Sequence, residues 1–328
     1  MCVFLTKRKI FLIKGVLLII TFFILAVLAL FKDGFQGLSS EPYQQTTQLF
    51  FNWEQVFENP ANVKVTTLVT GIAEGDRFIV LDETDPNIKN IKNRYEPSVV
   101  MSHWVRHPVK GDFLIDAGLS KTFSTGTGNY NYLLNLVFYL LDAKSKQSVN
   151  MDSAAQLNKN KVVLGSIFLT HLHADHTSGV ADFKDSVDVI FGKNEPTFMQ
   201  KAMMGEHLSG KKLFTIDFEN AVPMPPFSKA IDLFGDGSFW AISTAGHSPD
   251  HISYLVNAKS GPKLIVGDAA AYYAQLKHKI RPTPGVYNVK LAIEHLSQLN
   301  AFLTRYPDVE MLVGHELVNE EKDNITNH

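Results

Sequence analysis

The sequence has almost no cysteine. Its single cysteine, Cys2, stands among 328 residues and precedes every segment with the composition of a folded domain. This excludes a disulfide framework and any metal site with cysteine ligands. A metal ion could therefore be held only by histidine and carboxylate side chains.

The chain also lacks an excess of positive charge. Its 31 Lys and Arg residues are balanced by 33 Asp and Glu residues, for a net charge of -2. This balance disfavours a broad surface for a phosphate backbone, so we expect no nucleic-acid partner. Apolar residues make up 45% and charged residues 20%, without a long charge-rich segment, so most of the chain is predicted to be globular.

One long apolar run lies near the N-terminus, at Gly15–Phe31, and basic residues such as Lys7, Arg8 and Lys14 precede it. As a helix it would reach roughly 25 Å, which is short for a membrane span and long for the apolar part of a signal peptide. We favour an uncleaved transmembrane helix, because no clear cleavage motif follows. The charge bias then places the N-terminus in the cytoplasm and the rest of the chain on the outer, periplasmic or extracytoplasmic face. If the segment is cleaved, the protein is secreted.

Four parts are expected along the chain: a basic stub with the anchor or signal segment at 1–33, a tether with a short helix at 34–62, a folded domain at 63–320, and a polar tail at 321–328. Within the domain, β-rich runs alternate with helical ones. The predicted strands include VKVTTLVTGI, RFIVLD, VVMSHWVRH, SIFLT, VDVIF, FWAIST, ISYLV, KLIVGD and VEMLVGH, and helices are predicted at 129–141, 152–157 and 289–303. This order suggests an α/β fold in which sheets are sandwiched between helical layers.

Three histidines and an aspartate crowd into THLHADHTSG, directly after a short apolar strand. His171 and His173 are two residues apart, so at a strand end they point to the same side and can share a cation. Asp175 and His176 follow on a turn and can reach toward a second cation. Buried imidazoles crowded together without a cation would be costly, so the run predicts a metal site.

Three more candidate ligands each follow a small residue at the end of an apolar strand: His247, Asp268 and His315. Histidine and aspartate without cysteine suit two divalent metal ions, with zinc favoured and manganese, iron or cobalt acceptable. Asp268 is the natural bridge, because a carboxylate has two oxygens. The predicted ligands are His171, His173 and His247 for one ion, Asp175, His176 and His315 for the other, and Asp268 for both. The remaining histidines are predicted to be structural or solvated: His103, His107, His207, His251, His278, His295 and His328.

With these motifs the sequence resembles the metallo-β-lactamase-fold hydrolases. The resemblance covers roughly Val63 to Glu316 and rests on H-x-H-x-D-H at 171–176, followed by His, Asp and His in the family's order. FLIDAGLS is similar to the family's early strand and turn, in which Asp116 is usually a structural turn residue. The resemblance implies an αβ/βα four-layer sandwich with a dinuclear site at the shared edge of its two sheets.

Two cations sharing a water predict hydrolysis, with a metal-bridging hydroxide attacking an ester or lactone carbonyl. Asp175, near both the water and the leaving group, is the candidate proton shuttle. The chain looks closest to N-acyl-homoserine lactonases, in which a tyrosine three residues after the bridging aspartate contacts the substrate carbonyl. Here that position is Ala271, so the following Tyr272 is nominated for this contact, ahead of Tyr273. The expected partner is a small acyl ester or lactone.

Other functions use the same ligands. A glyoxalase II-like thioesterase and a phosphodiesterase share the metal chemistry and differ in pocket shape. A β-lactamase of the all-histidine type would not need Asp268, and an RNA-processing nuclease is disfavoured by the charge balance and the N-terminal segment. A non-catalytic, membrane-anchored binding protein is the alternative outside enzymes, although such relatives usually lose ligands and all seven positions are filled here. The oligomeric state is not indicated by the sequence.

Overall fold

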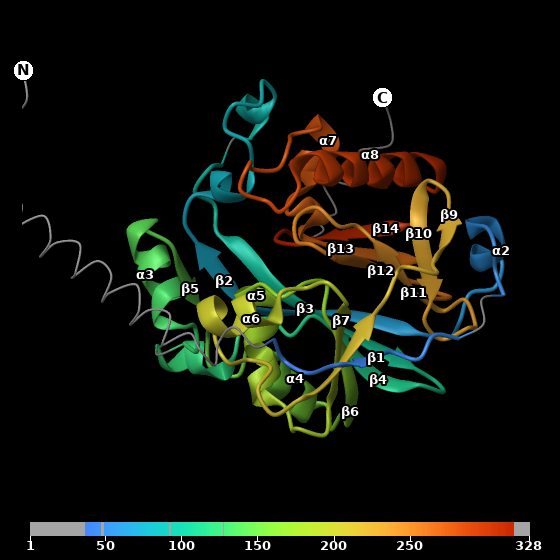
Figure 1. Ribbon diagram of the computed structural model, residues 1–328, viewed down its shortest axis with the longest axis horizontal. Helices are drawn as coiled ribbons and strands as arrows, with labels where there is room; N and C mark the ends of the chain where they lie inside the picture. The colour runs from blue at the N-terminus through green and yellow to red at the C-terminus, as the bar shows by residue number, and fades with distance from the viewer. Residues whose placement is uncertain (1–36, 47–48, 92, 127, 318–328) are drawn as a thin grey trace, which may run out of the picture.

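The computed structural model describes residues 37–46, 49–91, 93–126 and 128–317, and in this part of the chain two β-sheets face each other (Figure 1). The larger sheet contains, in spatial order, β1 (Glu41–Pro42), β8 (Lys212–Ile216), β7 (Asp188–Gly192), β6 (Leu164–Phe168), β4 (Gly111–Ile115), β3 (Ser98–His107), β2 (Lys64–Glu74) and β5 (Lys144–Lys146). The smaller sheet contains β14 (Glu310–Val313), β13 (Lys263–Gly267), β12 (Ile252–Val256), β11 (Phe239–Ser243), β10 (Phe227–Asp232) and β9 (Val222–Met224).

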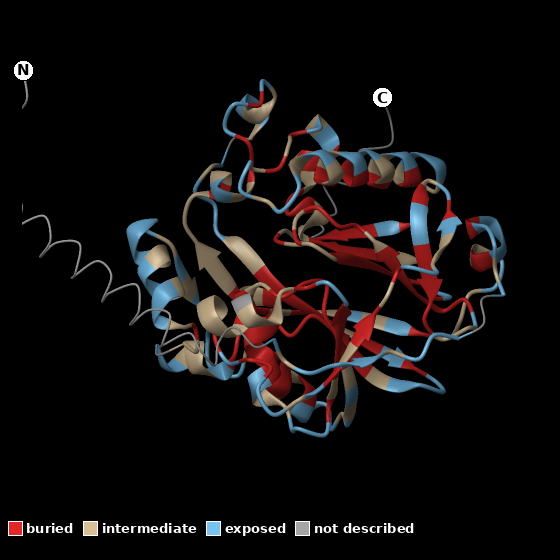
Figure 2. Ribbon diagram, viewed as in Figure 1, coloured by how far each residue is buried: buried red, intermediate tan, exposed pale blue. Residues whose placement is uncertain are grey.

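The main core lies between the two sheets. Phe113 and Phe168 from the larger sheet meet Phe239 and Tyr254 from the smaller one, and all four side chains are buried. The ring centroid of Phe239 is 4.7 Å from that of Phe113 and 5.0 Å from that of Phe168. Figure 2 shows this buried layer running through the inner strands. Large aromatic rings packed in this way fix the spacing of the sheets.

Helices cover the outer face of each sheet, so the sandwich has four layers (Figure 1). The helices are α2 (Trp53–Phe57), α3 (Tyr132–Leu140), α4 (Ser153–Lys159), α5 (Ala174–Thr177), α6 (Thr197–Met199), α7 (Tyr273–His278) and α8 (Val289–Arg305). Helix α8 packs on the smaller sheet through Leu299 and Phe302, and α4 packs on the larger sheet through Leu157. The predicted α/β class and four-layer arrangement are confirmed.

Most predicted elements are present, but RFIVLD is not a strand. Residues Arg77–Val80 form one turn of 3₁₀ helix. The carboxylate of Asp76 accepts a hydrogen bond from the backbone N–H of Phe78 at 3.0 Å and caps this turn. A local cap of this kind competes with strand formation, which explains why an apolar run with β-forming residues folds differently.

The segment expected to be a tether packs against the domain. It contains the predicted short helix, α2, but the ring of Trp53 is only 1% exposed and lies 5.3 Å from that of Trp240. Strand β1 also pairs in parallel with β8. A tryptophan has too much apolar surface to leave in water when a core face is within reach. The expected anchor and polar tail lie outside the described residues, and no helix within them is long and apolar enough to cross a membrane.

Candidate metal centre

The strand ends of both sheets bring the predicted ligands to one edge. His171 and His173 follow β6, and Asp175 and His176 lie in the short helix α5. From the smaller sheet, the ends of β11, β13 and β14 deliver the other three ligands: His247, Asp268 and His315. A rigid sheet edge holds side chains in place while leaving one side open.

The small residues before two of these ligands have a steric reason. A Cβ added at Gly314 would lie 2.5 Å from Oδ1 of Asp268 and 2.9 Å from the carbonyl oxygen of Gly267. Gly267 itself has a φ of 50°, which favours glycine. The two glycines therefore let β13 and β14 approach closely enough for Asp268 and His315 to meet.

All seven predicted ligands come together as two groups. One contains His171, His173, His247 and Asp268, and the other contains Asp175, His176 and His315; within each group the ligand atoms lie within 4.8 Å of one another. The grouping matches the predicted assignment. Their role as metal ligands stays a prediction. The position of Asp268 between the two groups supports its predicted role as the bridge.

Asp268 lies between the two groups and turns one oxygen to each. Its Oδ2 is 3.3 Å from Nε2 of His247 and 3.9 Å from Nε2 of His171. Its Oδ1 is 3.2 Å from Nε2 of His315 and 3.4 Å from Nε2 of His176. This is the arrangement that a bridging carboxylate needs.

The donor atoms fit divalent cations. Nε2 of His171, Nε2 of His176 and Oδ1 of Asp268 are buried and make no hydrogen bond within the described part of the chain. Buried polar atoms almost always have a partner, and three such atoms facing the same space point to cations as the missing partners. Imidazole nitrogens with carboxylate oxygens suit zinc, and also manganese, iron or cobalt.

The electrostatics favour the ligating protonation states in the first group. Burial lowers the pKa of His171 well below its ordinary value and that of His247 to about 3, so both rings are neutral and keep a lone pair. Burial alone would raise the pKa of Asp268, but the imidazoles of His315, His176 and His247 hold it well below its usual range. Asp268 is therefore ionised.

A layer of hydrogen bonds behind the ligands orients their rings. Oδ2 of Asp116 is 2.8 Å from Nδ1 of His176, and its Oδ1 accepts from the backbone N–H of Thr170 at 2.8 Å. Nδ1 of His315 donates to the carbonyl oxygen of Val99 at 3.0 Å. Bonds of this type leave Nε2 free for a metal. Asp116, with a φ of 57°, is the structural turn residue that the resemblance implied, and it also contacts His176.

His251 is a part of the centre that sequence reasoning missed. Its buried ring lies 5.1 Å from that of His171, and its Nε2 accepts a hydrogen bond from the backbone N–H of Asp268 at 3.2 Å. Its Nδ1 is 2.8 Å from Oγ1 of Thr244. His251 thus positions Asp268 through the backbone. The available signal was its place in STAGHSPDH, four residues after His247.

Tyr272 lies beside the second group, with its hydroxyl engaged. Its Oη is 2.6 Å from Oγ of Ser98, and its ring centroid is 6.4 Å from that of His315. The guanidinium of Arg77 stacks on the ring at 4.2 Å. Tyr273 instead donates to the carbonyl oxygen of Met311 at 2.7 Å, so Tyr272 is the tyrosine nearer the centre. Its contact with a substrate stays a prediction.

A cavity of about 350 Å³ opens next to Tyr272. Its wall includes Arg77, Glu96, Tyr272 and Glu316. The space is large enough for a small organic molecule. Asp175 is the half-buried carboxylate among the candidate ligands, and 27% of its side chain is exposed to solvent.

Comparison with known proteins identifies relatives among metallo-beta-lactamase-type hydrolases. Residues 95–317 match the metallo-beta-lactamase superfamily. The chain is 28% identical over 211 residues to a gamma-lactamase of Fusarium pseudograminearum, which covers 56% of this chain and 49% of that protein. It is 23% identical over 219 residues to an N-acyl homoserine lactonase of Agrobacterium fabrum, which covers 65% of this chain and 80% of that protein. The chain thus spans only about half the length of the fungal relative.

Solved structures share the fold. A mutant of AiiA from B. thuringiensis, with N-decanoyl-L-homoserine bound at its active site, superimposes with a TM-score of 0.59 at 16% identity, covering 79% of this chain and 94% of that one. A dizinc quorum-quenching lactonase, AidC, superimposes with a TM-score of 0.52 at 13% identity, covering 84% and 90%. At such identities the likeness concerns the fold alone.

Proposed function

Because the chain belongs to the metallo-beta-lactamase superfamily, we propose that it is a dinuclear metal-dependent hydrolase that cleaves an ester or lactone carbonyl. The observation that carries the proposal is the position of Asp268, with Oδ2 at 3.3 Å from Nε2 of His247 and Oδ1 at 3.2 Å from Nε2 of His315. One ionised carboxylate between two groups of imidazoles would be suited to hold two divalent cations.

The two groups around Asp268 would hold two divalent cations, preferably zinc. When bound, such a pair supplies Lewis acidity that makes water nucleophilic near neutral pH and polarises the carbonyl under attack. The remaining tasks fall to the protein. They are to move a proton from the attacking water to the leaving oxygen and to stabilise the developing negative charge.

Asp175 is placed to move the proton. Its Oδ2 is 3.4 Å from Nε2 of His315 and 3.8 Å from Nε2 of His176, and its side chain is partly open to solvent. In the proposed reaction the water oxygen bonds to the carbonyl carbon, the carbon–oxygen bond of the ester breaks, and Asp175 passes a water proton to the leaving oxygen. An Asp175→Asn variant that keeps both metals and full turnover would exclude this role.

Tyr272 is the candidate for the developing charge. Its hydroxyl would have to exchange its hydrogen bond with Ser98 for one with the substrate oxygen. Arg77 stacks on the ring, so the change would need only a rotation of the hydroxyl and no movement of the ring. The position after Ala271 therefore does not exclude the role.

The names of the relatives favour a cyclic substrate. One is a lactonase and another a gamma-lactamase, so a lactone is the first candidate and a γ-lactam the second. Thioesters and phosphodiesters remain the alternatives with the same ligands.

Metal content and turnover of the full-length protein test the proposal together. We expect about two metals per chain after expression with zinc or manganese, and hydrolysis of a long-chain N-acyl homoserine lactone followed by pH-stat. Asp268→Ala should lose metal and turnover, whereas Asp185→Asn, a matched control with a 78% exposed side chain, should keep both.

The other outcomes are equally informative. Turnover of a γ-lactam, S-lactoylglutathione or a phosphodiester instead of the lactone would replace the substrate class and leave the centre intact. Two metals without turnover of any of these compounds would contradict the proposed hydrolase. Absence of metal would contradict the dinuclear centre itself and favour the binding-protein alternative.

A further inference from the structure

Helix α3 exposes most of its apolar side chains to solvent. Its sequence, YLLNLVFYL, contains one polar residue, Asn135, and none of its residues is buried. The exposed side chains recur at helical spacing and form one stripe, here called the α3 stripe: Tyr132, Leu133, Leu136, Tyr139 and Leu140. Tyr132 and Tyr139 are each 81% exposed. A contiguous apolar stripe of this kind marks an interaction surface.

The opposite side of α3 holds the helix on the domain. Leu134 and Phe138 pack against a buried cluster that includes Tyr130. The ring centroids of Tyr130 and Phe138 are 5.5 Å apart. Packing on this side explains why the helix is fixed to the domain, but it gives no reason for a second apolar side facing outward.

The described chain begins beside α6, and the segment that follows α6 contacts the start of α3. The backbone N–H of Leu38 donates to Oγ1 of Thr197, the first residue of α6, at 2.9 Å. The stretch from Thr197 continues to Met204, whose carbonyl oxygen accepts from the backbone N–H of Asn131, the N-cap of α3, at 2.9 Å. Figure 1 shows α3 and α6 at the same end of the molecule.

The apolar run Gly15–Phe31 therefore joins the domain at the α3 end. Only residues 32–36 separate it from Gly37, and five extended residues span at most about 18 Å. If this run enters a lipid bilayer, the bilayer surface lies within reach of the α3 stripe.

Two partners could cover the α3 stripe: a lipid bilayer or the apolar run at residues 15–31. The bilayer is the better fit. Helix α3 has nine residues and is about 14 Å long. A run of roughly 25 Å laid along it would stay largely exposed to water. A bilayer covers both the run and the stripe. Tyr132 and Tyr139 also suit the interface, where an aromatic ring meets lipid and its hydroxyl meets water.

We propose that the α3 stripe lies in the surface layer of the bilayer that receives residues 15–31, so that the domain docks on the membrane by its α3 end. Helix α3 is too short to span and would lie flat in the interface. The inference rests on insertion of the N-terminal run and is independent of the proposed hydrolysis.

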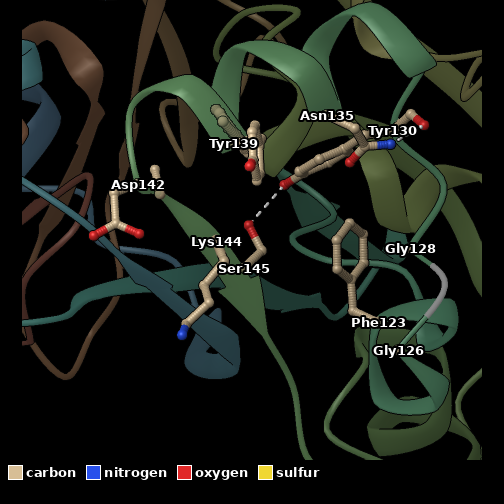
Figure 3. Close-up of a pocket in the computed structure, with 11 residues that line it drawn as sticks. Phe123, Gly126, Gly128, Tyr130, Asn135, Tyr139, Asp142, Lys144 and Ser145 are labelled. Carbon is tan, nitrogen blue, oxygen red and sulfur yellow. Dashed lines mark hydrogen bonds between the residues drawn. The ribbon is translucent and has the colours of Figure 1, made fainter.

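This docking would bring lipid close to the metal centre. A cavity of about 360 Å³ lies beneath α3, and Figure 3 shows Phe123, Tyr130 and Tyr139 along its wall. Tyr139 also belongs to the stripe. Tyr130 packs in one cluster with Ala174, the residue between His173 and Asp175. An amphiphilic molecule leaving the bilayer would meet this cavity at Tyr130, which belongs to the same buried cluster as Ala174 of the ligand loop.

Site-specific labelling of the full-length protein tests the proposal. Cys2→Ser removes the only native thiol, and Leu136→Cys then carries an NBD fluorophore. The protein is reconstituted in vesicles of phosphatidylethanolamine and phosphatidylglycerol, with and without brominated acyl chains. We expect a blue-shifted NBD emission and several-fold quenching by the brominated lipid.

Val163→Cys is the control. Val163 is 86% exposed and directly precedes β6, so it lies at the opposite end of this strand from the candidate metal ligands. Its label should remain in water and unquenched. Tyr139→Cys provides a second position in the stripe if the first variant does not fold.

Three results would overturn the proposal. The label on α3 would behave like the label at position 163 if the stripe faces water. It would be shielded without quenching if the N-terminal run covers the stripe. It would be shielded with energy transfer between donor-labelled and acceptor-labelled molecules if a second copy of the chain covers it.

Discussion

Oδ2 of Asp116 lies 2.8 Å from Nδ1 of His176, and both side chains are buried. Because the same carboxylate accepts a hydrogen bond from the backbone of Thr170, it is an acceptor and Nδ1 of His176 carries the proton. Nε2 is then the atom left to bind a metal. Asp116 thus sets the tautomer of a predicted ligand that follows a different strand.

Asp116→Asn should weaken metal binding at the second group. The amide can present an N–H to Nδ1, which favours the wrong tautomer of His176. Loss of a partner of this type typically costs about 10 to 100-fold in metal affinity. Competition with a chromophoric chelator would measure it, with Asp185→Asn as the surface control. Equal affinities in both variants would contradict the orienting role.

Removal of metal should destabilise the fold. A ligand present at about 100 times its dissociation constant contributes about 2.7 kcal/mol, which for a domain of this size corresponds to roughly 5 to 10 °C in Tm. Differential scanning calorimetry with and without EDTA would show the shift, and added zinc should restore it. Asp268→Ala should respond much less, and an equal response would mean that the chelator acts elsewhere.

Tyr272→Phe should lower kcat with little effect on KM, by about 100-fold if the hydroxyl stabilises the developing charge. Ser98→Ala separates this from a packing role, because it frees the hydroxyl without removing it. Steady-state kinetics of both variants, with Tyr273→Phe as control, give the comparison. Equal losses in Tyr272→Phe and Ser98→Ala would assign the hydroxyl a structural function only.

Glu195→Gln should change the pH dependence of stability. Burial raises the pKa of Glu195 to about 7. The folded state therefore keeps a proton that the unfolded chain releases at its lower pKa, so stability from this group is present at acidic pH and is lost as the pH rises through about 7.

Glutamine mimics the protonated form, so Glu195→Gln should be more stable than the native protein at pH 8, by up to about 3 kcal/mol, with the difference shrinking toward pH 5. Urea unfolding of the metal-loaded proteins at both pH values tests it. Glu206→Gln, at a 67% exposed side chain, is the control. A difference that is constant with pH would contradict the assignment.

Trp53→Ala should destabilise the domain by about 3 to 5 kcal/mol, since it empties a fully packed site in the core beneath α8. Phe51→Ala, only two residues away but 65% exposed, should change stability by less than about 0.5 kcal/mol. Urea unfolding compares them. Similar small effects would mean that the segment before residue 63 contributes little to the fold.

The grouping of the seven candidate ligands could be predicted because its signals are local. Each ligand follows an apolar strand, and strand ends of packed sheets meet at an edge, so the sequence alone suffices to join His247, Asp268 and His315 to the ligand loop. The bridging place of Asp268 follows from its two oxygens. These inferences need only residue type and position along the chain.

Other features could not be predicted from the pattern of apolar strands and the residues at their ends. His251 looks like any other histidine until the pairing of β12 with β13 puts its ring behind the backbone of Asp268. RFIVLD has the composition of a strand, but the carboxylate of Asp76 caps a 3₁₀ turn at this position. Trp53 stands in a segment of mixed polarity, and only its contacts with Trp240 and Phe302 show where its ring goes.

Ligands from both sheets meet at the centre, while the rings of Phe113, Phe239 and Tyr254 fill the layer between the sheets. In the proposed dinuclear centre, the thickness of the sandwich would therefore help to set the affinity for metal. A smaller side chain in that layer would let the two sheets move closer together and alter the distances within each group of candidate ligands, because each group draws on both sheets. The packing of the hydrophobic core would thus control the geometry of the proposed metal site at the edge of the sheets.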